Sequence, residues 1–439
     1  MLKKKWAPLT LVLVLVAMIL TACGGGSSGQ KSSSGDSQDK EEITFVNWAS
    51  AEESTREYVN KVIAEFEKQN PNIKVKSIPV SVSDMLNQLT IMVTGGNAPD
   101  VAQILASDGV TLAAMGAIEE TDNLVSKELA SDPYFKKSWD LGLYKDKHYG
   151  IPWALQPLGF WYNKKLMQEA GLDPNKPPKT WEEFNKYMDQ ARQKLPKETV
   201  IIGIDTTIRT IGLEQEWSYI RSFGALPVDG DKVAANSQQM INYATWLRKM
   251  VKEGYTLPGK KFGEFRPLAA QNRLVFTLDG PQFKGVVKSI NKNMTDQEFY
   301  NTWGLTSLPA GVDGKSYAAP DDHHLLIFKA SKHKEAALKF AEFLASNEVS
   351  LKEYIYPVGL LPATKTGFDK LPDLFGDNVR KAYVNEVLPN VVPLPVGPNL
   401  TKIATVIMAG MQEVVTTDKP IIDILNTVQT KLEGIIYGK

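Results

Sequence analysis

An alternation of short apolar runs and helical stretches over residues 43–105 limits most strongly which folds this chain can adopt. Residues 43–48 form an apolar run that predicts a strand, and Ser54 with Glu57 has the spacing of a helix capping box. An apolar face recurs at helical spacing until Asn70-Pro71, after which Ile73 and Val75 alternate with lysines as a second strand. A second helix, expected from Ser83 to Gly95-Gly96, precedes a strand over 101–105. The order strand, helix, strand, helix, strand predicts an open α/β sheet.

A second informative stretch runs from Lys147 to Phe184. Its apolar part begins at a Gly/Pro turn and ends at a polar edge, which indicates a strand followed by a short helix. Thr180 and Glu183 then form a capping box, and apolar residues follow at helical spacing. The sequence therefore predicts a helix that begins at this threonine.

Length and composition indicate a large, folded, charge-balanced protein. A chain of 439 residues is too long for one ordinary core and suits two large lobes. Its 43% hydrophobic and 23% charged residues are typical of globular proteins. With 50 basic and 50 acidic residues, it has no basic excess that would favour a nucleic-acid partner.

The N-terminus predicts the compartment. Three lysines at positions 3–5 precede an apolar run over 9–20, which is too short to span a bilayer and typical of a signal-peptide core. The run ends at Leu20-Thr21-Ala22-Cys23, which resembles a bacterial lipobox and implies cleavage before Cys23 and lipid on its sulfur. The alternative is a secretory signal with a chance cysteine. Since Cys23 is the only cysteine, no disulfide can form within the chain.

The next segment, completing residues 23–42, is rich in Gly and Ser and contains no apolar residue after Cys23, so we expect a flexible tether. Its Gly25-Gly26-Ser27-Ser28-Gly29 run formally matches a hydrolase nucleophile elbow. Because no strand precedes it and no helix follows it, we interpret this match as compositional.

Several blocks, in matching order and spacing, are similar to the family 1 extracellular solute-binding proteins, the sugar receptors of ABC importers related to maltose-binding protein. The blocks are Asn70-Pro71-Asn72-Ile73, Gly95-Gly96-Asn97-Ala98-Pro99-Asp100, Tyr149-Gly150-Ile151-Pro152, Tyr162-Asn163-Lys164, Pro177-Pro178-Lys179-Thr180-Trp181-Glu182-Glu183-Phe184 and Gly359-Leu360-Leu361-Pro362. The similarity is patchy and runs from about Ile43 to Tyr437. One departure is Gln282, which stands after Gly280-Pro281 where an aromatic residue is common in that family.

The resemblance implies an α/β, two-lobed fold of the periplasmic-binding-protein type II, or Venus-flytrap, kind, with lobes discontinuous in sequence. Residues 1–22 are expected to be the lipoprotein signal peptide and 23–42 the tether. Residues 43–153 with 321–362 are assigned to the N-terminal lobe, and 154–320 with 363–439 to the C-terminal lobe.

Candidate ligand contacts follow from position, because ligands of two-lobed α/β proteins lie at strand ends and at the interface between lobes. A sugar needs planar side chains for its ring faces and carboxylates, amides or hydroxyls for its hydroxyl groups. Most candidates follow a predicted strand or flank a predicted crossing, and Trp217 lies at a predicted loop–helix junction. Each has a plainer interpretation as a buried aromatic or a solvated turn. The candidates are Trp48, Glu52, Gln103, Asp108, Trp153, Gln156, Tyr162, Trp217, Asp279, Gln282, Asp322 and His323.

Metal binding and catalysis have little support in the sequence. In the run Asp321-Asp322-His323-His324, neighbouring strand residues point to opposite faces, so the two histidines do not easily share an ion unless the backbone turns there. Paired carboxylates such as Glu119-Glu120 fit turns or helix caps, and no phosphate-binding loop or His-Glu-x-x-His motif occurs. We expect no cofactor, no metal and no catalytic residue.

The resulting hypothesis is a non-enzymatic, monomeric receptor, held by lipid on Cys23 at the extracellular face of a bacterial membrane. We expect it to bind a carbohydrate, specifically an oligosaccharide, in the cleft between its lobes and to close over this ligand by a hinge motion. It then delivers the ligand to the permease subunits of an ABC importer. Two alternatives stay open: a surface-anchored carbohydrate-active hydrolase, and the same receptor with a metal, polyamine or peptide as cargo.

Overall fold

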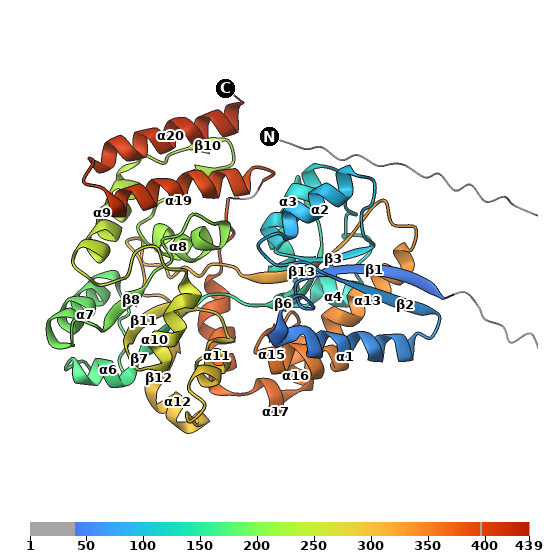
Figure 1. Cartoon of the computed structure of the whole chain (residues 1–439), viewed down its shortest axis with the longest axis horizontal. Coiled ribbons are helices and arrows are strands. Elements are labelled where there is room, and N and C mark those ends of the chain that lie inside the picture. The colour runs from blue at the N-terminus through green and yellow to red at the C-terminus, as the bar shows by residue number, and fades with distance from the viewer. Residues whose placement is uncertain (1–39, 396, 439) are drawn as a thin grey trace, which may run out of the picture. The chain divides into compact units, whose positions relative to one another are not determined.

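Two separate sheets, one of six strands and one of four, organise the chain in the computed structural model, which describes residues 40–395 and 397–438 (Figure 1). Both sheets belong to one structural unit. The predicted signal peptide, Cys23 and nearly all of the predicted tether lie outside the described residues. We call each sheet with the helices packed on it the first lobe and the second lobe.

The first sheet has the strand order β14-β6-β13-β3-β1-β2. Strand β1 pairs in parallel with β2 and β3, while β13 pairs antiparallel with both β3 and β6. The predicted strand–helix alternation therefore forms one half of this sheet, and segments distant in sequence complete it. The strands are β1 (Glu41–Asn47), β2 (Ile73–Pro79), β3 (Val101–Ile104), β6 (Ile151–Leu155), β13 (Asp322–Ile327) and β14 (Leu361–Pro362).

Helices cover both faces of the first sheet, whose inner strands β3, β6 and β13 are buried on both sides. On one face, the ring of Phe45 on β1 packs edge-on against Phe340 of α13, which also contacts Phe66 of α1. The other face packs against α2 and α3. The principal helices of this lobe are α1 (Glu53–Gln69), α2 (Met85–Thr94), α3 (Ala106–Ala114), α4 (Lys127–Ser131), α5 (Pro133–Trp139), α13 (Lys334–Ser346), α15 (Tyr356–Val358), α16 (Lys365–Lys370) and α17 (Pro372–Phe375).

The second sheet has the order β12-β7-β11-β8, with β7 antiparallel to both of its neighbours. Only three residues, Gln156 to Leu158, connect β6 of the first sheet to β7 of the second. The chain returns after β12 to enter β13. The strands are β7 (Gly159–Asn163), β8 (Val200–Gly203), β11 (Leu274–Asp279) and β12 (Trp303–Thr306).

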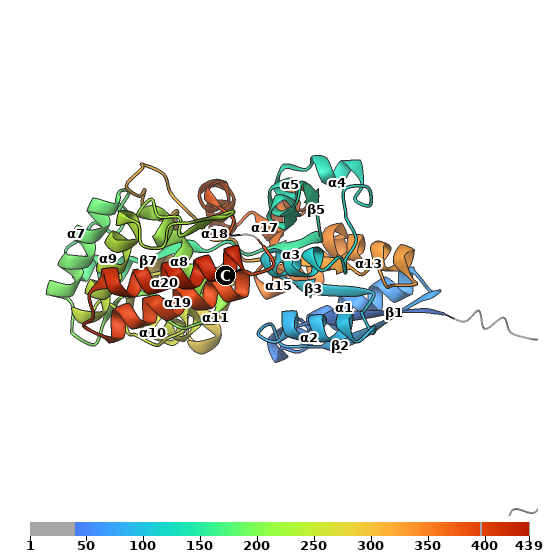
Figure 2. The ribbon, with the colours of Figure 1, turned by 90° about the horizontal axis from the view of Figure 1, so that it is seen from above.

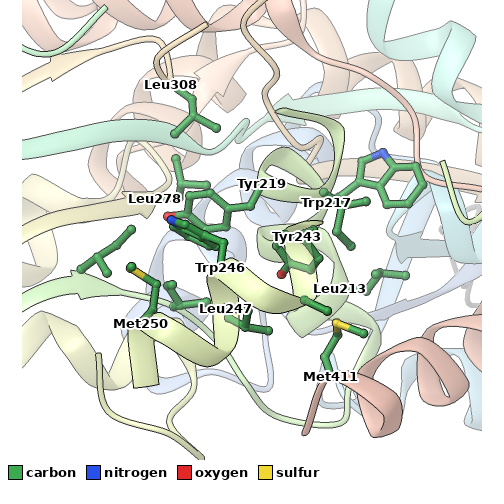
Figure 3. Packing of buried hydrophobic residues seen from close by; sticks show 14 of the residues in the cluster. Leu213, Trp217, Tyr219, Tyr243, Trp246, Leu247, Met250, Leu278, Leu308 and Met411 are labelled. Atoms are coloured by element: carbon green, nitrogen blue, oxygen red, sulfur yellow. The ribbon is translucent and has the colours of Figure 1, made fainter. Parts of the chain in front are cut away.

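The core of the second lobe is rich in aromatic residues. Tyr219 of α8 packs against Trp246 of α9, which also contacts Tyr243, and Trp217 belongs to the same cluster (Figure 3). Helices α19 and α20 pack against each other and against α9 (Figure 2). The main helices here are α6 (Lys164–Glu169), α7 (Trp181–Lys194), α8 (Thr210–Ser222), α9 (Gln238–Lys252), α10 (Arg266–Ala270), α11 (Phe283–Ile290), α12 (Asp296–Thr302), α18 (Asn378–Ala382), α19 (Leu400–Thr416) and α20 (Ile421–Tyr437).

The two predicted helix caps have different outcomes. Thr180 caps α7 as expected, because its side chain accepts a hydrogen bond from the Glu183 N–H at 3.2 Å. The predicted cap at Ser54 is wrong: α1 begins at Glu53, and its N-cap, Glu52, makes no side-chain capping bond. Likewise α2 begins at Met85, two residues later than expected.

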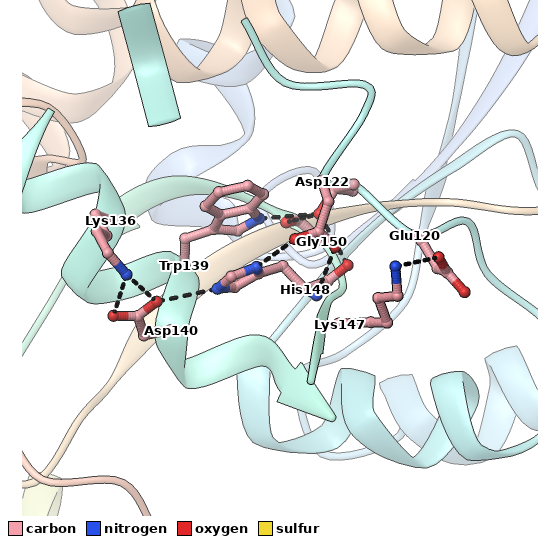
Figure 4. A network of polar contacts seen from close by, with 9 residues as sticks. Glu120, Asp122, Lys136, Trp139, Asp140, Lys147, His148 and Gly150 are labelled. Atoms are coloured by element: carbon pink, nitrogen blue, oxygen red, sulfur yellow. Dashed lines mark hydrogen bonds and ion pairs between the residues drawn. The ribbon is translucent and has the colours of Figure 1, made fainter. Parts of the chain in front are cut away.

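The side chain of His148 contacts several residues of the segment between β3 and β6. His148 Nδ1 lies 2.8 Å from Asp122 Oδ1, and its Nε2 lies 3.0 Å from Asp140 Oδ1 (Figure 4). The imidazole also stacks on Trp139, with ring centroids 4.0 Å apart.

The described helices include none that is long and apolar enough to span a bilayer.

Candidate ligand-binding cleft

A cleft of about 650 Å³ is lined by side chains from both lobes. First-lobe residues come from the end of β1, the start of α1, β13 and the π-helix η3 (Leu351–Ile355). Second-lobe residues come from the loop before α8, the 3₁₀-helix η2 (Phe262–Phe265), α10 and α11. These are loops and element ends held by rigid sheets, which is the usual setting of a binding site.

Five of the twelve predicted contacts line this cleft: Trp48, Glu52, Gln156, Gln282 and His323. The rings of Trp48 and His323 pack edge to face, with their centroids 5.0 Å apart. His323 Nδ1 is 3.2 Å from the amide nitrogen of Gln103, and burial lowers the pKa of His323 to about 4. Near neutral pH this imidazole is therefore uncharged and hydrogen-bonded in place.

Three predicted aromatic contacts lie in the protein core instead. Trp153 is fully buried on β6 and stacks on Tyr354, with ring centroids 4.5 Å apart. Tyr162 covers Gly304 on the neighbouring strand, and Trp217 donates a hydrogen bond to the Pro393 carbonyl at 2.9 Å. Their sequence positions near strand ends did not reveal that each ring points inward.

The four remaining predicted polar residues lie outside the lining of the cleft. Gln103 accepts a hydrogen bond from the Ala49 N–H at 3.2 Å, and Asp322 accepts one from Ser138 at 2.8 Å. Asp279 forms an ion pair with Arg266, and Arg266 lines the cleft. Asp108 lies in the first turn of α3, and burial raises its pKa to about 6.

A register shift occurs in β13 between His323 and His324. His323 faces the cleft, whereas His324 is fully buried, with its Nε2 2.8 Å from Asp322 Oδ2. The two histidines therefore have separate environments.

Several cleft residues were missed by sequence reasoning. Arg209 lies in the loop after β8. The expectation that ligands lie at strand ends, applied to β8, would therefore have included Arg209 among the candidates. Tyr354 lies within a π-helix, and Arg266 and Lys261 surround a short 3₁₀-helix; no periodic signal in the sequence marks either element. Single π-helical turns occur frequently at functional sites.

Carboxyl groups from both lobes meet beside the cleft. Burial, followed by repulsion from Asp322, raises the pKa of Asp321 to about 7. Burial and then Asp321 raise the pKa of Glu214, which enters from α8. Asp321 also accepts a hydrogen bond from the Gln156 amide at 3.0 Å. At neutral pH these neighbouring carboxyl groups therefore retain protons that isolated carboxyl groups would release.

Two α/β lobes with ring-bearing and hydrogen-bonding side chains around a shared cleft define a solute-binding protein. The family model for bacterial extracellular solute-binding proteins matches residues 50–350, and the chain belongs to this family.

The galactooligosaccharide-binding protein of Bacillus subtilis is 26% identical, over 91% of this chain and 90% of its own. The maltooligosaccharide ABC transporter solute-binding lipoprotein of Streptococcus pneumoniae is 24% identical, over 76% of this chain and 75% of its own.

Solved structures show the same fold. The sugar-binding protein MalE of Xanthomonas citri superposes with a TM-score of 0.76 at 22% identity, covering 90% of this chain and 98% of its own. A solute-binding protein of Thermotoga lettingae, bound to α-D-tagatose, has a TM-score of 0.75 at 21% identity, covering 90% and 100%. The predicted two-lobed α/β fold is thus confirmed.

Proposed function

We propose that this protein captures an oligosaccharide in the cleft between its lobes and releases it, unaltered, to the permease of an ABC importer. The observation that carries the proposal is the composition of the cleft. Trp48, Tyr58 and Tyr354 contribute aromatic side chains to the lining, while Gln156, Gln282 and His323 contribute hydrogen-bonding groups. Rings position a sugar and polar groups discriminate between its hydroxyls. The oligosaccharides in the names of two relatives support the same ligand class.

Hinge closure is part of this proposal. The short connection at residues 156–158 and the return before β13 let one lobe move against the other, and a ligand that contacts both lobes favours the closed state. Strand membership supports a division close to the predicted lobes, 43–153 with 321–362 and 154–320 with 363–439, although β6 continues to Leu155 and favours a first crossing after that residue. Leu371 and Phe375 pack in the core of the first lobe, which favours moving the end of that lobe to about Gly376.

A binding screen tests the function. The chain without residues 1–23 is melted in the presence of neutral and acidic oligosaccharides, divalent metals, polyamines and short peptides. A ligand at 100 times its Kd stabilises the folded state by about 2.7 kcal/mol, which a thermal shift detects. We expect one class of oligosaccharide to raise Tm. A shift with metals, polyamines or peptides alone would assign another cargo, and release of reducing ends would identify a hydrolase.

We also propose lipid attachment at Cys23 and a location on the extracellular face of the bacterial membrane. The name of the pneumococcal relative includes the word lipoprotein. Cys23→Ala should leave the protein unlipidated, so that labelled palmitate is no longer incorporated. Equal incorporation into the wild type and the variant would contradict this assignment. We further propose that the receptor is monomeric and docks on the permease subunits of the importer.

A further inference from the structure

The two sides of the cleft differ in chemistry. Rings dominate the first-lobe side, with Trp48, Tyr58 and Tyr354. The second-lobe side carries three cations, Arg209, Lys261 and Arg266. Of the carboxyl groups that line the cleft, Glu52 comes from the first-lobe side, and Asp321 precedes β13 and interacts electrostatically with Arg266. A ligand that spans the cleft therefore meets positive charge mainly at the second lobe.

The two guanidinium groups are fixed in position by buried carboxylates. Arg266 donates from Nε and Nη2 to the two oxygens of Asp279, at 2.9 and 2.8 Å, and Asp279 is fully buried. Arg209 pairs with the fully buried Asp205 and donates from Nε to Thr207 Oγ1 at 2.8 Å. Neither Nη1 makes a hydrogen bond to any residue in the described part of the chain, so both remain available to a ligand.

Asp205 also joins Arg209 to the turn that carries Lys261. Its Oδ2, which pairs with Arg209, accepts a hydrogen bond from the Phe262 N–H at 3.1 Å. The same loops are held together by Thr206, whose hydroxyl accepts from the Gly259 N–H at 2.7 Å. The guanidinium group of Arg209 and the backbone of the residue after Lys261 are thereby held by one carboxylate.

Lys261 supplies a third positive charge on this side of the cleft. Its side chain is exposed at the cleft and forms no ion pair among residues 40–395 and 397–438. By contrast, its neighbour Lys260 pairs with Glu264 at 3.7 Å and does not line the cleft. Asp205 and Asp279 balance the two arginines, whereas Lys261 has an electrostatic interaction with Glu264, whose carboxylate already pairs with Lys260.

We propose that the cleft selects oligosaccharides bearing a carboxylate, that is, chains containing uronic acid, with Arg209 and Lys261 contacting the carboxylate and the first-lobe rings contacting the sugar faces. An arginine edge with a neighbouring ammonium group forms charge-assisted hydrogen bonds to a carboxylate, which are about twice as strong as neutral ones. This inference rests on the proposed function, because it specifies the sugar that the same cleft takes.

Titration calorimetry on the full chain in mild detergent tests the inference. Trisaccharides of galacturonate, glucuronate and mannuronate are each compared with the neutral trisaccharide of the same stereochemistry. We expect at least one acidic sugar to bind roughly tenfold more tightly than its neutral partner, with a preference that shrinks as salt rises. Equal or tighter binding of every neutral partner would overturn the inference while leaving the proposed function intact. Absence of binding by all sugars would overturn both.

Matched lysine variants locate the contact. Lys261→Gln should weaken binding of the acidic sugar about three- to tenfold more than binding of the neutral sugar. Lys260→Gln, one residue away and outside the cleft, should change neither affinity. An equal loss of affinity for acidic and neutral sugars in Lys261→Gln would contradict the assignment, and so would an unchanged preference.

Discussion

Trp48 and Trp217 are both largely buried, but only Trp48 contributes to the cleft. The indole N–H of Trp48 has no hydrogen-bond partner within the described chain, whereas that of Trp217 is used by the Pro393 carbonyl. We expect Trp48→Phe to weaken oligosaccharide binding about two- to tenfold, because a donor to the ligand is lost. Trp217→Phe should instead lower the free energy of unfolding by about 1–3 kcal/mol and leave Kd unchanged. Calorimetry and urea denaturation of both variants separate the two roles. The reverse pattern would refute the placement of the site.

Glu216 gives a pH-dependent prediction at the same scale. Its carboxyl group is fully buried on α8, accepts a hydrogen bond from Tyr243 at 2.6 Å, and has a pKa raised by burial to about 8. The folded protein holds this proton, which the unfolded chain releases above about pH 4.5, so stability falls as pH rises from 4.5 to 8. Glu216→Gln should remove this contribution, matching the wild type near pH 5 and exceeding its unfolding free energy by a few kcal/mol at pH 9. Urea denaturation at both pH values measures this. The exposed Glu335→Gln serves as control, and equal pH slopes for Glu216→Gln and wild type would count against the prediction.

At the scale of elements, the packing of α19 on α20 depends on a residue without a side chain. A Cβ at Gly410 would lie 2.3 Å from Cγ2 of Val428, whose branched side chain has little rotamer freedom. Gly410→Ala should therefore separate the two helices and cost about 1–3 kcal/mol despite the better helix propensity of alanine. Gly285→Ala in α11 is the matched control, since no atom lies within 4 Å of the position that its Cβ would take, and the change should be neutral or slightly stabilising. Chemical denaturation compares them. A Gly410→Ala variant as stable as the wild type would show that the helices relax without cost.

At the scale of the whole molecule, strand β13 joins two halves of the first sheet. It lies between β3 and β6 but follows β12 of the second sheet in sequence. A fragment of residues 40–320 lacks this strand, which leaves the edges of β3 and β6 unpaired, and we expect no cooperative unfolding transition. A chain in which residues 40–155 are linked by Gly and Ser to 321–376 contains every strand of the sheet and should fold. Circular dichroism during thermal denaturation distinguishes them. Cooperative unfolding of the 40–320 fragment would contradict this description of the lobe.

Local patterns in the sequence determined the α/β class, the helix cap at Thr180 and the approximate bounds of many elements, because periodicity and capping depend on neighbouring residues. Strand-end positions also identified Trp48, Gln156 and His323 as cleft residues. Only the tertiary structure decided that Trp153 and Trp217 point into the cores, that β13 completes the first sheet, and that Asp205 links Arg209 to the turn that carries Lys261. Those outcomes depend on contacts between residues far apart in the chain, and no local spacing encodes which distant partner a side chain meets.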